Sequence, residues 1–272
     1  MSFDSSERVA LPPMPSDGAP LAGAFDALAA RARGGDGPAA VRLLEATLRC
    51  ARLDNDRAIL ASMDAHPSKP GNIDGRARIE ARAREFVAAN ESFCAGATQA
   101  QTQNSGEWLS RAAASGDPGS QACYAEMGAS DNWLPEYASD AWIDAMRRYR
   151  DNAPGDAEAA FAAGVPEAAY TLYELSAGRY AMMAFLTDSR VAPDYSKAYA
   201  LALFQASRFA RSDATADSNA ELEAVWRIRA KLLERELSGA EIERARTWAD
   251  AEERRFASRA PPALPCEGWV GQ

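Results

Sequence analysis

The sequence repeats one short phrase three times, each time where an alanine-rich helix would end. The copies are residues 32–40 (ARGGDGPAA), 113–121 (AASGDPGSQ) and 162–169 (AAGVPEAA). Glycine ends a helix readily because it adopts the left-handed conformation without steric cost, and small or capping residues after it can start the next helix. A recurring helix–turn–helix unit predicts stacked helical hairpins, and proteins built in this way usually act by holding partners.

The composition supports a purely helical chain. Of the 272 residues, 47% are hydrophobic and only 8% are aromatic, with alanine dominating the apolar positions. Alanine has the highest helix propensity and lets helices approach closely, so we expect an all-α fold. The copies lie 81 and 48 positions apart, which is too uneven for a regular array. The sequence therefore predicts an irregular α-solenoid of antiparallel helical hairpins, with about 10 to 12 helices.

The chain is acidic, with 39 Asp and Glu against 30 Lys and Arg and a formal charge of −9. This charge repels nucleic-acid phosphates and anionic lipid surfaces, and it favours a basic partner. No stretch approaches the roughly 20 consecutive apolar residues that a membrane-spanning helix needs. We expect a protein or peptide partner, no nucleic acid and no membrane span, while the oligomeric state stays undetermined.

Breaks in the pattern divide the chain into four parts. Proline-rich residues precede the first helix, and a second proline-rich run follows the last one. We expect an extended or disordered segment at 1–19, an N-terminal helical region at 20–96, a repeat region at 97–260 and a proline-rich tail at 261–272.

Start and stop signals predict the individual helices of the N-terminal region. Apolar periodicity predicts a helix over 21–33, and Asp36 is placed to cap the next helix. We further expect a separate short helix at 57–63 and a charged helix at 74–93, whose arginines and glutamates form a solvated, internally paired face.

In the second half, proline and serine mark the expected boundaries. Asp117 and Pro118 have the residue types of a capped helix start, and Pro135 is expected to open a helix that stops at 154–156. Ser218 and Ser238 each begin a Ser-x-x-Glu capping box, so the last two helices are predicted to form an antiparallel hairpin.

The four cysteines allow two interpretations. No two of them lie close enough for the Cys-x-x-Cys spacing of zinc or redox sites. Cys50 and Cys94 each end an expected helix and form our first candidate disulfide, while Cys123 and Cys266 form a weaker one. Disulfides indicate an oxidising compartment, so we expect a periplasmic or secreted protein whose signal lies outside this sequence. The alternative is a cytoplasmic protein with four buried thiols.

Residues typical of catalysis are scarce. The one histidine, His66, stands in a Pro/Lys/Gly loop without a second ligand, so we expect it to be exposed and to bind no metal. The nucleophile-elbow, phosphate-loop and dinucleotide motifs do not occur. A pair of carboxylates could catalyse glycoside hydrolysis, but no spacing marks such a pair. We therefore expect no enzyme activity and no cofactor.

Aromatic residues concentrate in the middle third of the chain, and Trp and Tyr are common anchors in protein interfaces. Trp133 is the leading candidate contact because it lies in an expected loop rather than on a helical stripe. Tyr137, Tyr170 and Tyr195 are the other candidate partner-binding residues. The alternative is that most of these rings fill helix interfaces.

Three segments resemble the Sel1-like repeat, a tetratricopeptide-like family. The segment 191–201 (VAPDYSKAYAL) resembles its Asp-Tyr-x-Lys-Ala helix start, although Arg190 stands where the family has glycine. Trp108 followed by Ala112, Ala113 and Gly116 is similar to the end of a repeat, and 168–173 (AAYTLY) to its opening helix. The resemblance implies an adaptor without enzymatic activity, bacterial and often exported, whose concave face binds peptides or protein surfaces.

Three functional classes follow from these observations. The favoured class is a non-enzymatic protein–protein interaction scaffold of Sel1-like type. The second is an immunity or inhibitor protein that binds one cognate partner through complementary charge. The third is a cell-wall or glycan-binding module, or a hydrolase with two carboxylates across a cleft.

Overall fold

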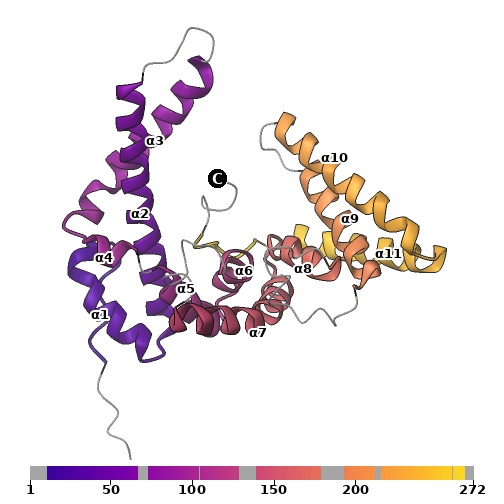
Figure 1. Ribbon diagram of the computed structural model, residues 1–272, viewed down its shortest axis with the longest axis horizontal. Helices are drawn as coiled ribbons and strands as arrows, with labels where there is room; N and C mark the ends of the chain where they lie inside the picture. Colours follow the sequence, from indigo (N-terminus) through magenta and orange to yellow (C-terminus); the bar gives the residue numbers. More distant parts are fainter. Residues whose placement is uncertain are drawn as a thin grey trace, which may run out of the picture. The chain divides into compact units, whose positions relative to one another are not determined.

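The computed structural model describes residues 11–66, 73–103, 105–128, 139–178, 193–211, 216–258 and 260–266. Across these ranges all regular secondary structure is helical, as the composition predicts (Figure 1). The helices are α1 Leu21–Arg33, α2 Gly37–Ala65, α3 Ile73–Cys94, α4 Gln99–Thr102, α5 Ser105–Ala114, α6 Pro118–Met127, α7 Asp140–Ala163, α8 Ala168–Ser176, α9 Tyr195–Arg211, α10 Ala216–Leu233 and α11 Gly239–Ala257, with a short 3₁₀ helix, η2, at Glu234–Glu236.

All three copies of the repeated phrase form the expected turn. Gly35, Gly116 and Gly164 have φ values of 89°, 87° and 104°, in the region that disfavours any side chain. Asp36 and Asp117 then cap the following helices by accepting hydrogen bonds from the backbone N–H groups three residues on, at 3.1 and 2.8 Å. The third copy has no such cap. The phrase is thus a helix-turn signal in every copy and a capping signal in two.

The chain divides into two compact units, which are described separately. The N-terminal unit comprises Met1–Ser115 with Pro265–Gln272, and the C-terminal unit comprises Gly116–Leu264. Helix α5 packs on α2 and belongs to the N-terminal unit.

In the N-terminal unit, α2 is the central helix and contacts α1, α3 and α5. The prediction of a separate helix at 57–63 is wrong, because α2 continues without a break to Ala65. No glycine or proline interrupts the chain between Pro38 and His66, so no residue of this stretch ends the helix early. Leu43, Leu48 and Leu53 are buried on different sides of α2, as expected for a helix that has neighbours on several sides.

A disulfide joins the middle of α2 to the last residue of α3. Cys50 and Cys94 have their Cα atoms 5.5 Å apart and their sulfur atoms 2.12 Å apart. This is the pair that the sequence analysis placed first, although Cys50 lies within α2 rather than at its end. Cys123 and Cys266 are also disulfide-bonded, and both are buried.

In the C-terminal unit, α7 is a single helix that contains Pro154. The prediction that this proline stops the helix is wrong. Proline inside a helix costs about 3 kcal/mol through a lost hydrogen bond and a steric clash. Residues on both sides of it offset this cost, since Tyr149, Ala153, Ala157 and Phe161 are all buried on one face.

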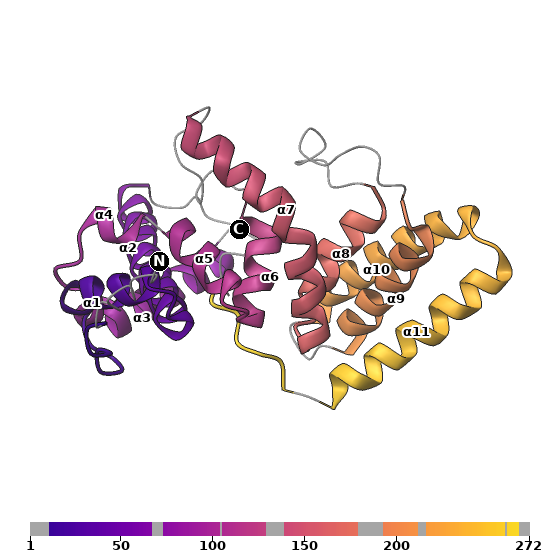
Figure 2. The same ribbon diagram turned by 90° about the horizontal axis from the view of Figure 1, so that it is seen from below.

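The last three helices share α9 as their common support. Both α10 and α11 pack extensively on α9, which also contacts α8 (Figure 2). The predicted hairpin in which α10 and α11 pack mainly on each other is therefore wrong. The capping box at Ser238 is present, with Glu241 bonded back to the Ser238 amide at 2.8 Å, but α10 begins at Ala216, two residues before the other predicted cap.

Candidate functional site

Two of the four predicted partner-binding residues lie among the described residues. Tyr170 on α8 is 38% exposed, and Tyr195, the first residue of α9, is 36% exposed. Trp133 and Tyr137 lie outside the described residues. Among the described residues, most other aromatic side chains of the C-terminal unit are buried, as the alternative interpretation expected, including Tyr149, Tyr173 and Tyr199.

Tyr170 borders a group of aromatic and charged side chains on α8 and α10. Its ring meets Trp226 edge to face at 6.0 Å. The Arg229 guanidinium lies 4.5 Å above the Trp226 ring and forms an ion pair with Glu174 at 3.3 Å. Burial raises the pKa of Tyr170, and the negative charge of Glu174 adds to this effect. The phenol is therefore neutral at physiological pH and can donate a hydrogen bond at the surface.

A second carboxylate group lies near Tyr170. Glu126 on α6 has its pKa raised to about 7, first by burial and then by the negative charge of Glu167, with Arg208 acting in the opposite direction. Arg208 donates a hydrogen bond to Glu167 and neutralises that carboxylate. Glu126 thus changes its charge close to neutral pH, which no feature of the sequence indicated.

Two neighbouring hollows lie along α9 and α11. The first has a volume of about 340 Å³ and the second about 310 Å³. Lys197 on α9 and Trp248 on α11 line both, so the hollows adjoin at these two side chains. We call the pair the α9–α11 groove. The first hollow is lined by Asp194, Ser196, Lys197, Ala200, Arg244, Ala245 and Trp248, and the second by Glu158, Phe161, Ala162, Leu172, Lys197, Leu201, Trp248, Glu252 and Arg255.

Aromatic packing fixes the floor of the groove. Phe161 stacks on Trp248 with ring centres 5.9 Å apart and an angle of 19° between the planes. Phe161 also contacts Phe204 at 5.4 Å and Phe256 at 4.9 Å. Trp248 is half-buried and lines both hollows. An indole held in place and partly open to solvent can stack on or enclose an apolar group.

Charged side chains of both signs surround this apolar floor. Lys197 forms an ion pair with Glu158 at 2.9 Å. Arg255 donates hydrogen bonds to the backbone oxygens of Ala162 at 2.8 Å and Phe161 at 3.1 Å, which ties α11 to the end of α7. An apolar floor with polar groups at its rim is the usual arrangement of a binding site.

Tyr195 stands beside the groove rather than in it. Asp194 and Ser196, on either side of Tyr195 in the chain, line the first hollow, whereas Tyr195 does not. Trp248 was not among the residues predicted to contact a partner, although it lies on the expected last helix. A periodic pattern cannot reveal that a ring on this face is left partly uncovered.

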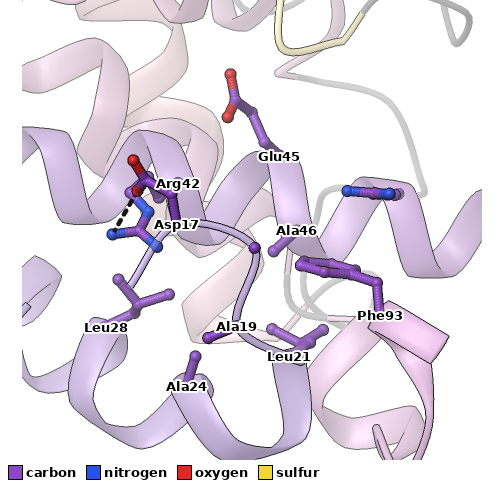
Figure 3. A pocket seen from close by; sticks show the side chains of 11 residues that line it. Asp17, Ala19, Leu21, Ala24, Leu28, Arg42, Glu45, Ala46 and Phe93 are labelled. Carbon is purple, nitrogen blue, oxygen red and sulfur yellow. Dashed lines mark ion pairs between the residues drawn. The ribbon is translucent and has the colours of Figure 1, made fainter. Parts of the chain in front are cut away.

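The N-terminal unit has a smaller hollow of about 280 Å³ (Figure 3). Leu21 and Leu28 of α1 and Ala46 of α2 are buried and form its apolar wall. Arg42 donates hydrogen bonds to the backbone oxygens of residues 15 and 16, at 2.7 and 2.9 Å, and lies 3.4 Å from Asp17. Arg42 therefore holds the segment before α1 in place.

The other cation of this hollow is also engaged in packing. The Arg49 Nε–H donates to Asn90, and the guanidinium lies 4.3 Å above the Phe93 ring. Since both arginines connect elements of the N-terminal unit, this hollow is a weaker candidate for ligand binding than the α9–α11 groove.

The described residues contain no group of three or more His, Cys, Asp and Glu side chains placed to hold a metal ion. Among their helices none has the length and apolar character needed to cross a bilayer. Comparison with known proteins found no matching family model, no matching curated protein and no matching solved structure.

Proposed function

We propose that this chain is a non-enzymatic scaffold of Sel1-like type that binds a peptide segment of a partner protein in the α9–α11 groove. One observation carries the proposal: two adjoining hollows share a half-buried tryptophan as their common wall. Tryptophan is enriched among the residues that dominate binding energy. A ring fixed from behind by Phe161 loses little conformational freedom when a ligand covers it.

The charges suggest what kind of peptide fits. The chain carries a net charge of −9, which attracts a basic partner at long range. The groove itself is lined by three acidic side chains, which are Asp194, Glu158 and Glu252, and by three cationic ones, which are Lys197, Arg244 and Arg255. We therefore expect a basic peptide with one large apolar side chain that contacts Trp248.

The disulfides support an exported location. The described cysteines form disulfide-distance pairs and leave no free thiol in that part of the chain. Such bonds persist in the periplasm and outside the cell but are rare in the cytosol. We propose that the protein works in a bacterial periplasm or as a secreted protein.

Peptide selection followed by affinity measurement tests the groove. A phage-displayed peptide library is selected on the immobilised full chain, and the Kd of each enriched peptide is measured by fluorescence anisotropy. Trp248→Ala is expected to raise this Kd at least about tenfold, since it removes the central contact. Trp142→Ala on α7 is the matched control and should change the Kd less than about twofold.

Trp248→Ala also removes the stacking of Trp248 on Phe161, so weaker peptide binding could result from disturbed packing inside the protein. A second variant, at an exposed residue on the edge of the groove, tests peptide contact without changing this packing. Arg244 is exposed and lines the first hollow. Arg244→Glu removes a positive charge facing a basic peptide and should tighten its binding. Enriched peptides whose Kd responds to neither Trp248→Ala nor Arg244→Glu would refute the groove as the binding site.

A further inference from the structure

One face of α10 exposes an unusual number of apolar side chains. Val225 is 44% exposed, Ile228 61% and Leu232 44%. These residues belong to a series spaced by four, three, four and three positions, which begins at Glu221 and ends at Arg235 in η2. This spacing keeps side chains on one side of a helix and is the pattern of a two-helix seam. We call these five residues the α10 seam.

The α10 seam is not part of the packing of the C-terminal unit. Helix α10 packs on α9, and its buried side chains are Trp226, Ala230 and Leu233, which are 4%, 3% and 5% exposed. The seam lies on another side of the same helix. Isolated exposed apolar residues are ordinary, but three at seam spacing form a continuous patch that association would cover.

The charges at the two ends of the seam are opposite and equally far from its centre. Glu221 lies seven residues before Ile228, and Arg235 lies seven residues after it. Both are exposed, and neither forms an ion pair with any residue in the described part of the chain. By contrast, Arg227 is paired with Glu223 at 2.6 Å, and Lys231 with Glu234 at 2.5 Å.

We propose that the partner of the α10 seam is a second copy of this chain, bound antiparallel about a twofold axis at Ile228. In that arrangement the two Ile228 side chains meet, and Val225 of each copy lies beside Leu232 of the other. Each Glu221 then faces Arg235 of the other copy, so the two opposite charges can form an ion pair twice per dimer. A parallel arrangement would place like charges together, which is unfavourable.

Ala224 has a small side chain, which allows the α10 helices of the two copies to approach each other closely. It is exposed, and in the antiparallel register it lies opposite Leu232 of the second copy. A self-complementary surface of this kind is what a twofold interface requires, because each residue must meet its counterpart from the same patch. None of the five seam residues lines the α9–α11 groove, so the dimer and peptide binding are independent proposals.

Sedimentation velocity of the full oxidised chain over a wide concentration range tests the dimer. The wild type is expected to show a reversible monomer–dimer equilibrium. Ile228→Glu places two carboxylates on the twofold axis and should raise the dimer Kd at least about tenfold. Ile79→Glu on α3 is the matched control, since Ile79 is 51% exposed and lies in the other unit. It should leave the Kd unchanged, with circular dichroism confirming that both variants fold.

Charge reversal tests the antiparallel register. Glu221→Lys or Arg235→Glu alone should raise the Kd about twofold to tenfold, because like charges then face each other twice per dimer. The double variant, Glu221→Lys with Arg235→Glu, restores opposite charges and should return the Kd to near the wild-type value. Two results would overturn the proposal: a wild type that stays monomeric at millimolar concentration, or a dimer that Ile228→Glu does not weaken. A double variant as weak as the single ones would overturn the antiparallel register.

Discussion

The two units hold their helices together in different ways. In the N-terminal unit, leucine and alanine side chains fill the core around α2, and the Cys50–Cys94 disulfide joins α2 to α3. In the C-terminal unit, aromatic rings contact one another between helices. The ring centres of Tyr124 and Tyr149 are 5.4 Å apart, and Phe161 is part of a second aromatic cluster. The N-terminal unit thus depends mainly on aliphatic packing and a disulfide between two of its helices, and the C-terminal unit on contacts between aromatic rings. This difference predicts which substitutions destabilise each unit most.

The largest effect is expected from removing the central ring of the C-terminal unit. Phe161 is 7% exposed and contacts Phe204, Trp248 and Phe256. Phe161→Ala should lower the free energy of unfolding by about 3–5 kcal/mol, because it leaves a cavity among these rings. Hydrogen exchange followed by mass spectrometry should show faster exchange in α7, α9 and α11.

Two control measurements test whether the effect of Phe161→Ala is specific to the C-terminal unit. Phe209→Ala, at a half-buried ring near the end of α9, is the control and should cost less. Exchange in α1 and α2 should stay as in the wild type. Equal acceleration in both units would contradict the view that their cores are separate.

The disulfide is expected to have the next largest effect, and in the other unit. The Cys50→Ala, Cys94→Ala double variant frees a loop closed across 44 positions. The free energy of unfolding of the N-terminal unit should fall by about 2–4 kcal/mol, because the unfolded chain gains conformational freedom. Exchange should accelerate in α3 and remain unchanged in α9 and α11. Unchanged exchange in α3 would mean that aliphatic packing alone holds this helix.

The smallest expected effect depends on pH and concerns Glu126. The folded state raises the pKa of this carboxyl to about 7, so folding favours its protonated form. The corresponding stability is present at low pH and is lost as pH rises from about 4.5 to about 7, up to about 3 kcal/mol. Glu126→Gln cannot ionise and should therefore stabilise the protein above pH 7 and flatten this part of the pH profile.

Chemical denaturation of both proteins at a series of pH values measures this effect. Glu85→Gln is the control, because Glu85 is an exposed glutamate on α3 in the other unit. It should leave the difference between pH 5 and pH 8 as in the wild type. If Glu126→Gln has the same pH profile as the wild type, the carboxyl is ionised in the folded protein already at pH 5.

Local rules predicted the helices well where their signals were strong. The bounds of α1 match the predicted range, and α3 differs from its prediction by one residue at each end. The caps at Asp36, Asp117 and Ser238 also follow from neighbouring residues alone. Capping depends on atoms three residues apart, so the sequence contains the whole interaction.

Local rules failed where burial outweighed them. Pro154 has the residue type of a helix stop, but α7 continues through it because its neighbours are buried on both sides. The prediction that α10 and α11 form a hairpin was wrong for a similar reason. Two amphipathic helices joined by a short turn can pack on each other or on a third helix, and α9 offered the larger apolar surface.

The candidate site was predictable only in part. Tyr170 and Tyr195 are exposed, as their selection as contact residues required, yet the groove is lined by Trp248, which was not among the predicted contacts. The raised pKa of Glu126 was not predictable at all, because Glu167 is distant in sequence and the burial arises from other helices.

The sequence by itself determined the helical class, the glycine turns and the helix caps, since each depends on residues within one turn of each other. Only the tertiary structure decided which helices pack together, which side of Trp248 stays open, and that the apolar stripe of α10 is left uncovered. The burial of a side chain depends on the whole fold, because it is set by which other helices cover the apolar face on which the side chain lies. The local sequence pattern does not contain this information.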